Sequence, residues 1–145
     1  TLDESYFTAL YNWYNDRFDW QIQPEWIVKS PGVVFSICTA IRALTKPGDA
    51  VIIQQPVYYP FENSIKDNSR RPIVNQLLNS NGKYYMNLDE FERQIVKENV
   101  KLFILCNPHN PVGRVWTREE LTQIGDICLR HGVYVISDEI HQDFV

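Results

Sequence analysis

Apolar residues follow two different spacings along this chain. Near the N-terminus, aromatic and aliphatic residues recur every three or four positions, which is typical of an amphipathic helix over residues 3–18. Further along, several short runs are apolar at every position, as expected of strands that are covered on both faces. The pattern therefore predicts helices that alternate with buried strands.

Four further helices are predicted after residue 30. They are VVFSICTAIRAL at 33–44, a short helix around 60–67, LDEFERQIVKE at 88–98, and a helix that ends near Arg130. Asn87 is placed to cap the third of these helices. Thr117 and Glu120 have the spacing of a capping box for the fourth, and His131 with Gly132 ends it.

Five strands are predicted between these helices. They are WIVKS at 26–30, AVIIQQ at 50–55, a strand near PIVNQLL at 72–78, KLFILC at 101–106 and VYVIS at 133–137. Turns are predicted at 46–49 and at NSNGK, 79–83. This order indicates an α/β fold with a mainly parallel sheet and helices on both faces. The sequence shows no internal repeat and no linker.

Composition and charge narrow the classes of protein that this chain can represent. Its 145 residues correspond to about one domain, and its net charge of −4 argues against a general nucleic-acid binder. No apolar run approaches the roughly 20 residues that span a bilayer, and no signal-peptide pattern is present, so no membrane partner is expected. Cys38, Cys106 and Cys128 have no paired spacing. We expect buried free thiols and a reducing, cytoplasmic compartment.

The candidate chemistry lies where the predicted strands end. Ligands of parallel α/β sheets bind beyond the carboxyl ends of the strands. After WIVKS, Gly32 opens a helix whose first N–H groups suit an anion. After AVIIQQ, Tyr58 offers a flat face for a planar ring. Taken singly, these two features are better explained by an ordinary strand–helix turn and by one tyrosine in the core beside one at the surface.

Two later strand ends carry polar side chains. KLFILC is followed by NPHNPVG, in which an Asn amide can donate to a ligand oxygen. VYVIS is followed by Asp138, and an acid at the end of a buried strand is costly unless it meets a cation. A proline-stiffened turn and a structural ion pair explain each of these alone. Together, the four strand ends suit a planar, phosphorylated, basic heteroaromatic ligand.

These motifs resemble a known superfamily. NPHNPVG followed by Asp138 in VISDEIH is similar to the fold-type I pyridoxal-phosphate enzymes of the class I/II aminotransferase superfamily. CNPHNPVGRVWTREEL and SDEIHQDF resemble more narrowly its cystathionine β-lyase (C–S lyase) branch. The resemblance covers essentially the whole chain, as the middle of the large domain.

The resemblance implies pyridoxal 5′-phosphate as the cofactor. The residues implied to bind it are Val33, Val34, Tyr58, Asn110, Asp138 and His141. Asn110 would donate to the phenolic oxygen, Asp138 would pair with the pyridine nitrogen, and Tyr58 would stack on the ring. The backbone of Val33 and Val34 would hold the phosphate. His141 stands where many aminotransferases carry a tyrosine that bonds the phenolic oxygen.

The resemblance also implies parts that these residues do not supply. The Schiff-base lysine is expected after Val145, in a Ser-x-x-Lys-type segment. None of the lysines present lies in such a segment; they are Lys29, Lys46, Lys66, Lys83, Lys97 and Lys101. Residues 1–145 are therefore expected to be part of the large cofactor-binding domain, without its N-terminal arm, lysine segment, substrate-carboxylate arginine or small domain. They would be inactive alone, with no catalytic residue among them, and the full-length protein would be a homodimer.

Two structural expectations come from the same resemblance. One is a cis peptide bond before Pro56 or Pro111. The other is that the strand at 26–30 pairs with a strand contributed later in the chain. Without that strand, the isolated chain would carry an unpaired apolar edge and associate.

The leading functional hypothesis is a C–S β-lyase that converts cystathionine or cysteine S-conjugates, both small amino-acid substrates, to thiol, pyruvate and ammonia. The nearest alternative is an aminotransferase of the same fold, and a non-catalytic descendant stays open. VISDEIH also reads as the DExH box of a helicase, but no phosphate loop precedes it. A metal site at Cys106, His109, His131 and His141 matches no common zinc spacing, and no metal is expected.

Overall fold

The computed structural model describes residues 3–145 of the chain. They divide into two compact units, the first ending at Pro31 and the second running from Gly32 to Val145. The hydrophobic pattern does not predict this boundary. Pro31 and Gly32 fit an ordinary turn between a strand and a helix of one domain.

The first unit is built on one amphipathic helix, as predicted. Helix α1 spans Glu4–Phe18, its N-cap residue Asp3 accepts a hydrogen bond from the Ser5 backbone, and Asp19 closes it in the left-handed conformation. The short 3₁₀ helix η1 follows at Pro24–Trp26.

The predicted strand at 26–30 is wrong. Trp26 ends a 3₁₀ helix, and residues 27–30 have no regular secondary structure. Trp26 and Val28 are both strongly exposed. A strand needs a pairing partner for its backbone groups, and this segment belongs to a different unit from the sheet. A run with β-prone residues is therefore not sufficient to form a strand here.

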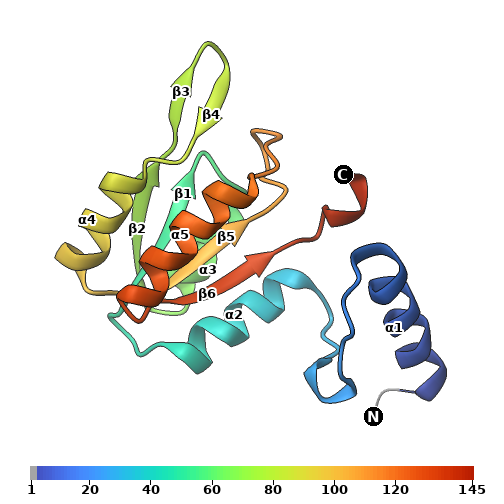
Figure 1. The fold of residues 1–145 in the computed structure, drawn as a ribbon. Helices are drawn as coiled ribbons and strands as arrows, with labels where there is room; N and C mark the ends of the chain where they lie inside the picture. The colour runs from blue at the N-terminus through green and yellow to red at the C-terminus, as the bar shows by residue number, and fades with distance from the viewer. Residues whose placement is uncertain (1–2) are drawn as a thin grey trace. The chain divides into compact units, whose positions relative to one another are not determined.

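The second unit contains the predicted parallel sheet. Its strands are β1 (Ala50–Gln55), β2 (Arg71–Gln76), β5 (Val100–Cys106) and β6 (Tyr134–Asp138). They lie in the order β2-β1-β5-β6, and every neighbouring pair is parallel (Figure 1).

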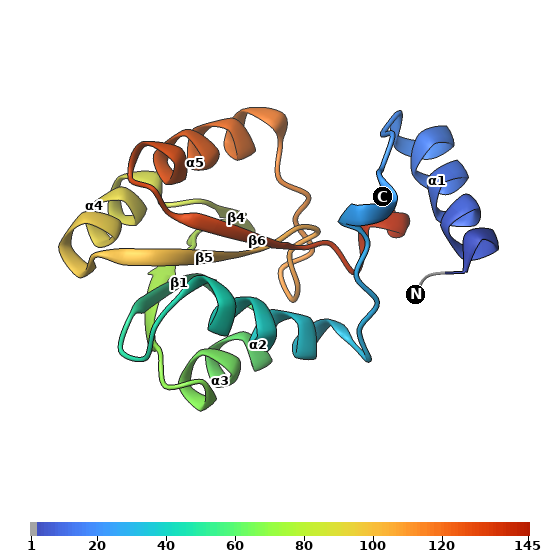
Figure 2. The ribbon, with the colours of Figure 1, turned by 90° about the horizontal axis from the view of Figure 1, so that it is seen from below.

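Helices cover both faces of this sheet, which confirms the predicted fold class. Helices α2 (Val33–Leu44) and α3 (Pro60–Asp67) lie on one face, and α4 (Leu88–Glu98) and α5 (Arg118–Arg130) lie on the other (Figure 2). Each face has its own apolar core. One contains Ile41 and Phe61 with Ile53 of β1, and the other contains Phe91 of α4 with Phe103 of β5.

A small hairpin joins β2 to α4. Strands β3 (Leu78–Ser80) and β4 (Lys83–Tyr85) are antiparallel and flank the predicted turn. Asn81 and Gly82 both have positive φ, as an Asn-Gly hairpin turn requires. The turn was predicted, but the two short strands beside it were not, because they are largely exposed and carry no apolar run.

The predicted helix caps form, and the three cysteines are free thiols. Asn87 caps α4, and Thr117 with Glu120 forms the full capping box of α5. All three cysteines are free; Cys106 and Cys128 are buried, whereas Cys38 is only half-buried. No helix within residues 3–145 is both long enough and apolar enough to cross a membrane.

Parallel pairing brings the ends of the strands together. Cys106, the last residue of β5, lies opposite Asp138, the last residue of β6, and β1 ends beside them at Gln55. The segments that follow all three strands therefore leave the sheet at one edge.

Candidate functional site

A cavity of about 360 Å³ lies at this carboxyl edge of the sheet. It is lined by Val33, Val34, Tyr58, Cys106, Asn110, Asp138, Ile140 and His141. Cavities that bind small molecules usually occupy about 300–1,000 Å³, so this one is large enough for a cofactor. All six residues singled out from the sequence line this cavity.

Two further residues, Cys106 and Ile140, line the cavity without having been predicted to do so. Cys106 is the last residue of β5 and Ile140 follows β6, so their place at the strand ends was available as a signal. Their side chains are apolar or weakly polar, so they lack the strong polarity or the aromatic ring that marks a candidate ligand-binding residue at a strand end.

The start of α2 forms one wall of the cavity. Its cap residue, Gly32, has an extended backbone and no side chain that could cap the helix. The first N–H groups of a helix have no carbonyl partner within it, and they carry the positive end of its dipole. Val33 and Val34 therefore present the type of backbone surface that binds phosphate groups.

Tyr58 comes from the segment that follows β1. Its ring lies edge-on to Phe61, 6.0 Å away between centroids, and 5.5 Å from the ring of Tyr59. Phe61 is fully buried, whereas Tyr58 is more than a third exposed. The core thus fixes one edge of the tyrosine ring and leaves part of it open to the cavity.

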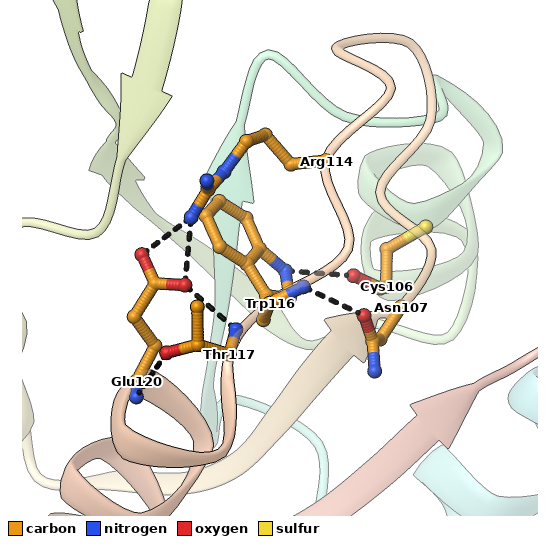
Figure 3. A network of polar contacts seen from close by, with 6 residues as sticks. All are labelled: Cys106, Asn107, Arg114, Trp116, Thr117 and Glu120. Atoms are coloured by element: carbon orange, nitrogen blue, oxygen red, sulfur yellow. Dashed lines mark hydrogen bonds and ion pairs between the residues drawn. The ribbon is translucent and has the colours of Figure 1, made fainter. Parts of the chain in front are cut away.

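The segment after β5 is held by a network of side chains (Figure 3). The Trp116 indole donates to the Cys106 carbonyl at 3.1 Å, and the Trp116 backbone donates to Asn107 Oδ1 at 3.2 Å. The Arg114 guanidinium donates to both carboxylate oxygens of Glu120, which also accepts from the Thr117 backbone. The turn between β5 and α5 is therefore tied at both ends.

The two asparagines of NPHNPVG have different surroundings. Asn107 supports the turn through Trp116, whereas Asn110 lines the cavity. The Asn110 backbone donates to Cys106 Sγ at 3.4 Å. Within residues 3–145, no protein group hydrogen-bonds its side-chain amide. That amide is available to a ligand.

The Cys106 thiol supports the same turn. Its sulfur lies 3.4 Å from the Pro108 carbonyl and accepts the Asn110 N–H. Burial raises the pKa of Cys106, the Asn110 N–H opposes that effect, and the nearby Asp138 charge adds to it. The thiol stays protonated at neutral pH and has the character of a structural group.

Asp138 is a buried acidic residue in the cavity. The residue is 7% exposed, and its Oδ1 accepts the Ile140 backbone N–H at 3.2 Å. In the described part of the chain, no lysine, arginine or histidine forms an ion pair with it. A buried carboxylate without a cation is costly, so Asp138 is suited to a ligand that brings one.

His141 lies at the opening of the short helix η2 (Gln142–Phe144). It is half-buried, and its ring is tilted relative to that of Phe144, with 6.2 Å between centroids. It shares the cavity wall with Asp138, three residues earlier.

The prediction of a cis peptide bond before Pro56 or Pro111 is confirmed. The structure has cis bonds at both positions, and a third before Pro108. Across residues 3–145, no group of three or more histidine, cysteine, aspartate or glutamate side chains is arranged to hold a metal ion.

The fold and the cavity define a class of protein. A parallel α/β sheet carries, at one carboxyl edge, a helix N-terminus, an aromatic ring, an amide and a buried carboxylate. These groups together suit a phosphorylated, basic aromatic cofactor. Residues 2–145 match the aminotransferase class I and II family, and the chain belongs to that family.

Several relatives share nearly the whole of this chain. It is 45% identical over 145 residues to cystathionine beta-lyase PatB of Bacillus subtilis, covering 100% of this chain and 38% of that protein. The crystal structure of cystalysin from Treponema denticola, which contains pyridoxal 5′-phosphate, superposes with a TM-score of 0.95 at 43% identity, over 99% of this chain and 36% of that one. A PLP-bound putative aminotransferase from Clostridium difficile 630 gives 0.93 at 50% identity, over 99% and 37%. The chain thus spans less than two-fifths of the length of these relatives.

Proposed function

We propose that this chain is part of a pyridoxal-phosphate-dependent C–S β-lyase. The substrate would be cystathionine or a cysteine S-conjugate, and the products thiol, pyruvate and ammonia. The observation that carries the proposal is the cavity in which the amide of Asn110, the carboxylate of Asp138 and the ring of Tyr58 meet the start of α2. The 45% identity to a cystathionine β-lyase supports the choice of reaction.

The groups in the cavity fit this cofactor. The buried carboxylate of Asp138 has no cation of its own in the described residues, and a protonated pyridine nitrogen would supply one. The unpartnered amide of Asn110 can donate to a phenolic oxygen. The uncapped start of α2 suits the phosphate, and Tyr58 suits the ring face. When bound, pyridoxal phosphate supplies an electron sink for the negative charge that develops at the substrate Cα.

Each residue then has a proposed role. Asp138 keeps the pyridine nitrogen protonated, because a buried carboxylate favours a neighbouring positive charge. Asn110 stabilises negative charge on the phenolic oxygen, and His141, which lines the same cavity, is proposed to assist it. Val33 and Val34 orient the phosphate through their backbone N–H groups, and Tyr58 excludes water from one ring face.

The group that removes the Cα proton is proposed to lie outside residues 1–145. No lysine among residues 3–145 lines the cavity, and a desolvated lysine is needed both to hold the cofactor covalently and to move the proton. We therefore propose that these residues are part of the large cofactor-binding domain of a longer enzyme, which also has a small domain. We further propose that the enzyme is a cytoplasmic homodimer; its free cysteines fit a reducing compartment.

The test uses the full-length protein. Purified with pyridoxal phosphate, it should show the absorbance of bound cofactor and release pyruvate and free thiol from cystathionine without any added 2-oxo acid. Absence of bound cofactor in the native protein would refute the proposed site.

The second candidate is an aminotransferase, which the 50% identity to a putative aminotransferase favours. In that case the bound cofactor would be present, but turnover would require a 2-oxo acid acceptor and would release no thiol. The same assay with and without 2-oxoglutarate separates the two reactions. The family match favours both over the helicase hypothesis.

A further inference from the structure

His109 is buried within the NPHNPVG turn. It is 2% exposed, although its neighbour Asn110 lines the cavity. Its ring packs edge-on against the indole of Trp116, with 5.3 Å between centroids. The same Trp116 is bonded to the carbonyl of Cys106, so the imidazole lies between the end of β5 and the start of α5.

The imidazole reaches across to the neighbouring strand end. Its Nε2 lies 2.9 Å from the carbonyl oxygen of Pro56, which directly follows β1. A carbonyl can only accept, so Nε2 must carry the proton. Pro56 precedes Tyr58 by two residues and His109 precedes Asn110 by one. This single hydrogen bond therefore joins the segment that carries the aromatic face to the segment that carries the amide.

The backbone of His109 is fixed as well. Its N–H donates to the Arg114 carbonyl at 2.7 Å, and its carbonyl accepts the Gly113 N–H at 2.8 Å. The turn therefore holds one side of the residue and the Pro56 carbonyl holds the other. Displacement of the ring would be transmitted to Asn110 through the shared peptide unit.

The ring is neutral in this environment. Burial lowers the pKa of His109, and the carbonyls of Pro56, Cys106 and Gln54 oppose that effect only in part. With its one proton on Nε2, the ring has a bare Nδ1, which is buried and has no hydrogen-bond partner in the described part of the chain. Phenylalanine would remove this unpartnered atom but leave the Pro56 carbonyl without its donor. These effects on stability oppose each other, whereas the effect on position does not cancel.

We infer that His109 is a positioning residue, which fixes the Asn110 amide relative to the Tyr58 ring by donating from Nε2 to the Pro56 carbonyl. The inference rests on the proposed function, because the two groups must act on one cofactor ring. If the bond is lost, Asn110 donates less well to the phenolic oxygen. The negative form of that oxygen is then less favoured, and the pH at which it loses its proton rises.

The experiment compares two substitutions in the full-length protein loaded with pyridoxal phosphate. His109→Phe removes the donor and keeps a planar ring, whereas His109→Gln keeps an N–H donor. The control is His131→Phe, since His131 bonds Glu92 between α4 and α5 and lines no part of the cavity. The readout is the pH midpoint of the absorbance change of the bound cofactor, measured without substrate.

His109→Phe should raise this midpoint by about half to one pH unit, the size expected when one hydrogen bond to a charged oxygen is weakened. His109→Gln keeps a donor, so its midpoint should stay close to the native value. His131→Phe should leave the midpoint unchanged. An unchanged midpoint in His109→Phe, or equal shifts in the Phe and Gln variants, would overturn the inference. If the native protein binds no cofactor, the proposed function itself fails, and the two failures are thereby distinguished.

A second measurement does not depend on the folding of the Phe variant. Nitrogen-15 NMR of the histidine rings in the native protein should show His109 as the neutral tautomer with the proton on Nε2 between pH 6 and pH 8. Its signal is assigned by its absence in His109→Gln. A ring protonated on Nδ1 alone, or a positively charged ring, would be incompatible with the proposed bond.

Discussion

Asp138 and Asn110 occupy the same cavity but depend on a ligand to different degrees. The carboxylate of Asp138 is buried, and a single backbone N–H bonds it within the described residues. The amide of Asn110 is half-buried and neutral. Leaving a charge unpaired costs far more than leaving an amide unpaired, so Asp138 should dominate binding of the cofactor.

Asp138→Asn in the full-length protein should therefore weaken the proposed enzyme severely. The amide keeps the size of the side chain but cannot stabilise a protonated pyridine nitrogen. Losing one partner of a buried ion pair typically costs about 3–5 kcal/mol, so lyase activity should fall by at least about 100-fold. The measurement is pyruvate release, together with the absorbance of bound cofactor.

Asp126→Asn is the matched control. Asp126 is an exposed residue of α5 and forms no ion pair within residues 3–145. It should keep native activity. Equal activity of the Asp138→Asn protein and its control would remove Asp138 from the proposed site.

At this scale the sequence predicted which residues meet, but not how their neighbours hold them. Val33, Val34, Tyr58, Asn110, Asp138 and His141 all line one cavity. Tyr58, Asn110 and Asp138 follow β1, β5 and β6, and the carboxyl ends of these parallel strands meet at one edge. The resemblance, and not strand order, placed Val33, Val34 and His141 with them, because no strand forms at 26–30. The support given by His109 and Cys106 depends on the path of the turn, and local residue pattern carries no information about that path.

Among the elements, the buried strands and helices were the predictable part. Strands β1 and β5 are almost entirely buried, and α2 and α4 pack one apolar face against them. Such elements are stabilised by burial in the core, so their apolar residues recur with the period of a helix or run continuously in a buried strand. The segment at 26–30 has apolar residues without a core or a partner strand, so the same signal was misleading there.

Helices α4 and α5 are joined at the surface by a carboxylate. Glu92 Oε1 accepts from His131 Nε2 at 2.8 Å and from Arg130 Nη1 at 2.9 Å. The hydrogen bond from His131 is the main reason that the pKa of Glu92 lies below its usual 4.5; desolvation opposes it, and the charges of Arg130 and His131 add to it.

Glu92→Gln should lower the melting temperature by about 1–3 °C at neutral pH, as expected for a surface interaction of this kind. A carboxyl with a depressed pKa in the folded state stabilises the protein above its unfolded pKa and loses that effect as pH falls through its folded pKa. The difference between the native and Glu92→Gln proteins should therefore shrink as the pH falls below about 4.5, because the folded pKa of Glu92 lies below that value. Calorimetry at pH 7 and pH 3.5 measures it.

Asp126→Asn serves as the control here too, because it removes a carboxylate from α5 that has no ion-pair partner in the described residues. Its melting temperature should follow the native value at both pH values. A Glu92→Gln difference that persists undiminished at pH 3.5 would show that the carboxylate charge is not the cause.

For the whole molecule, the two outer strands of the sheet differ in how they are protected. Strand β2 carries Pro72, which cannot donate to a further strand, and Arg71, which pairs with Glu98 at 2.7 Å. Strand β6 pairs only with β5 among residues 3–145. Its Tyr134 and Val135 are exposed. The strand predicted at 26–30, which was expected to lack a partner, does not form. Among the described residues, β6 instead has the unpaired, partly apolar edge that favours association.

The 145-residue chain expressed alone should therefore associate through β6 at concentrations of tens of micromolar, since an exposed apolar edge strand is a template for pairing. Val135→Lys should shift it toward the 17.1 kDa monomer, because a lysine on an edge strand opposes pairing with a second copy. Leu129→Lys is the matched control: Leu129 is 82% exposed but lies on helix α5, whose backbone groups are bonded within the helix and offer no strand edge for pairing. Light scattering after gel filtration measures the mass of each protein over a concentration series. A native chain that stays monomeric throughout, or a Leu129→Lys chain that dissociates as readily as Val135→Lys, would place the association elsewhere than on β6.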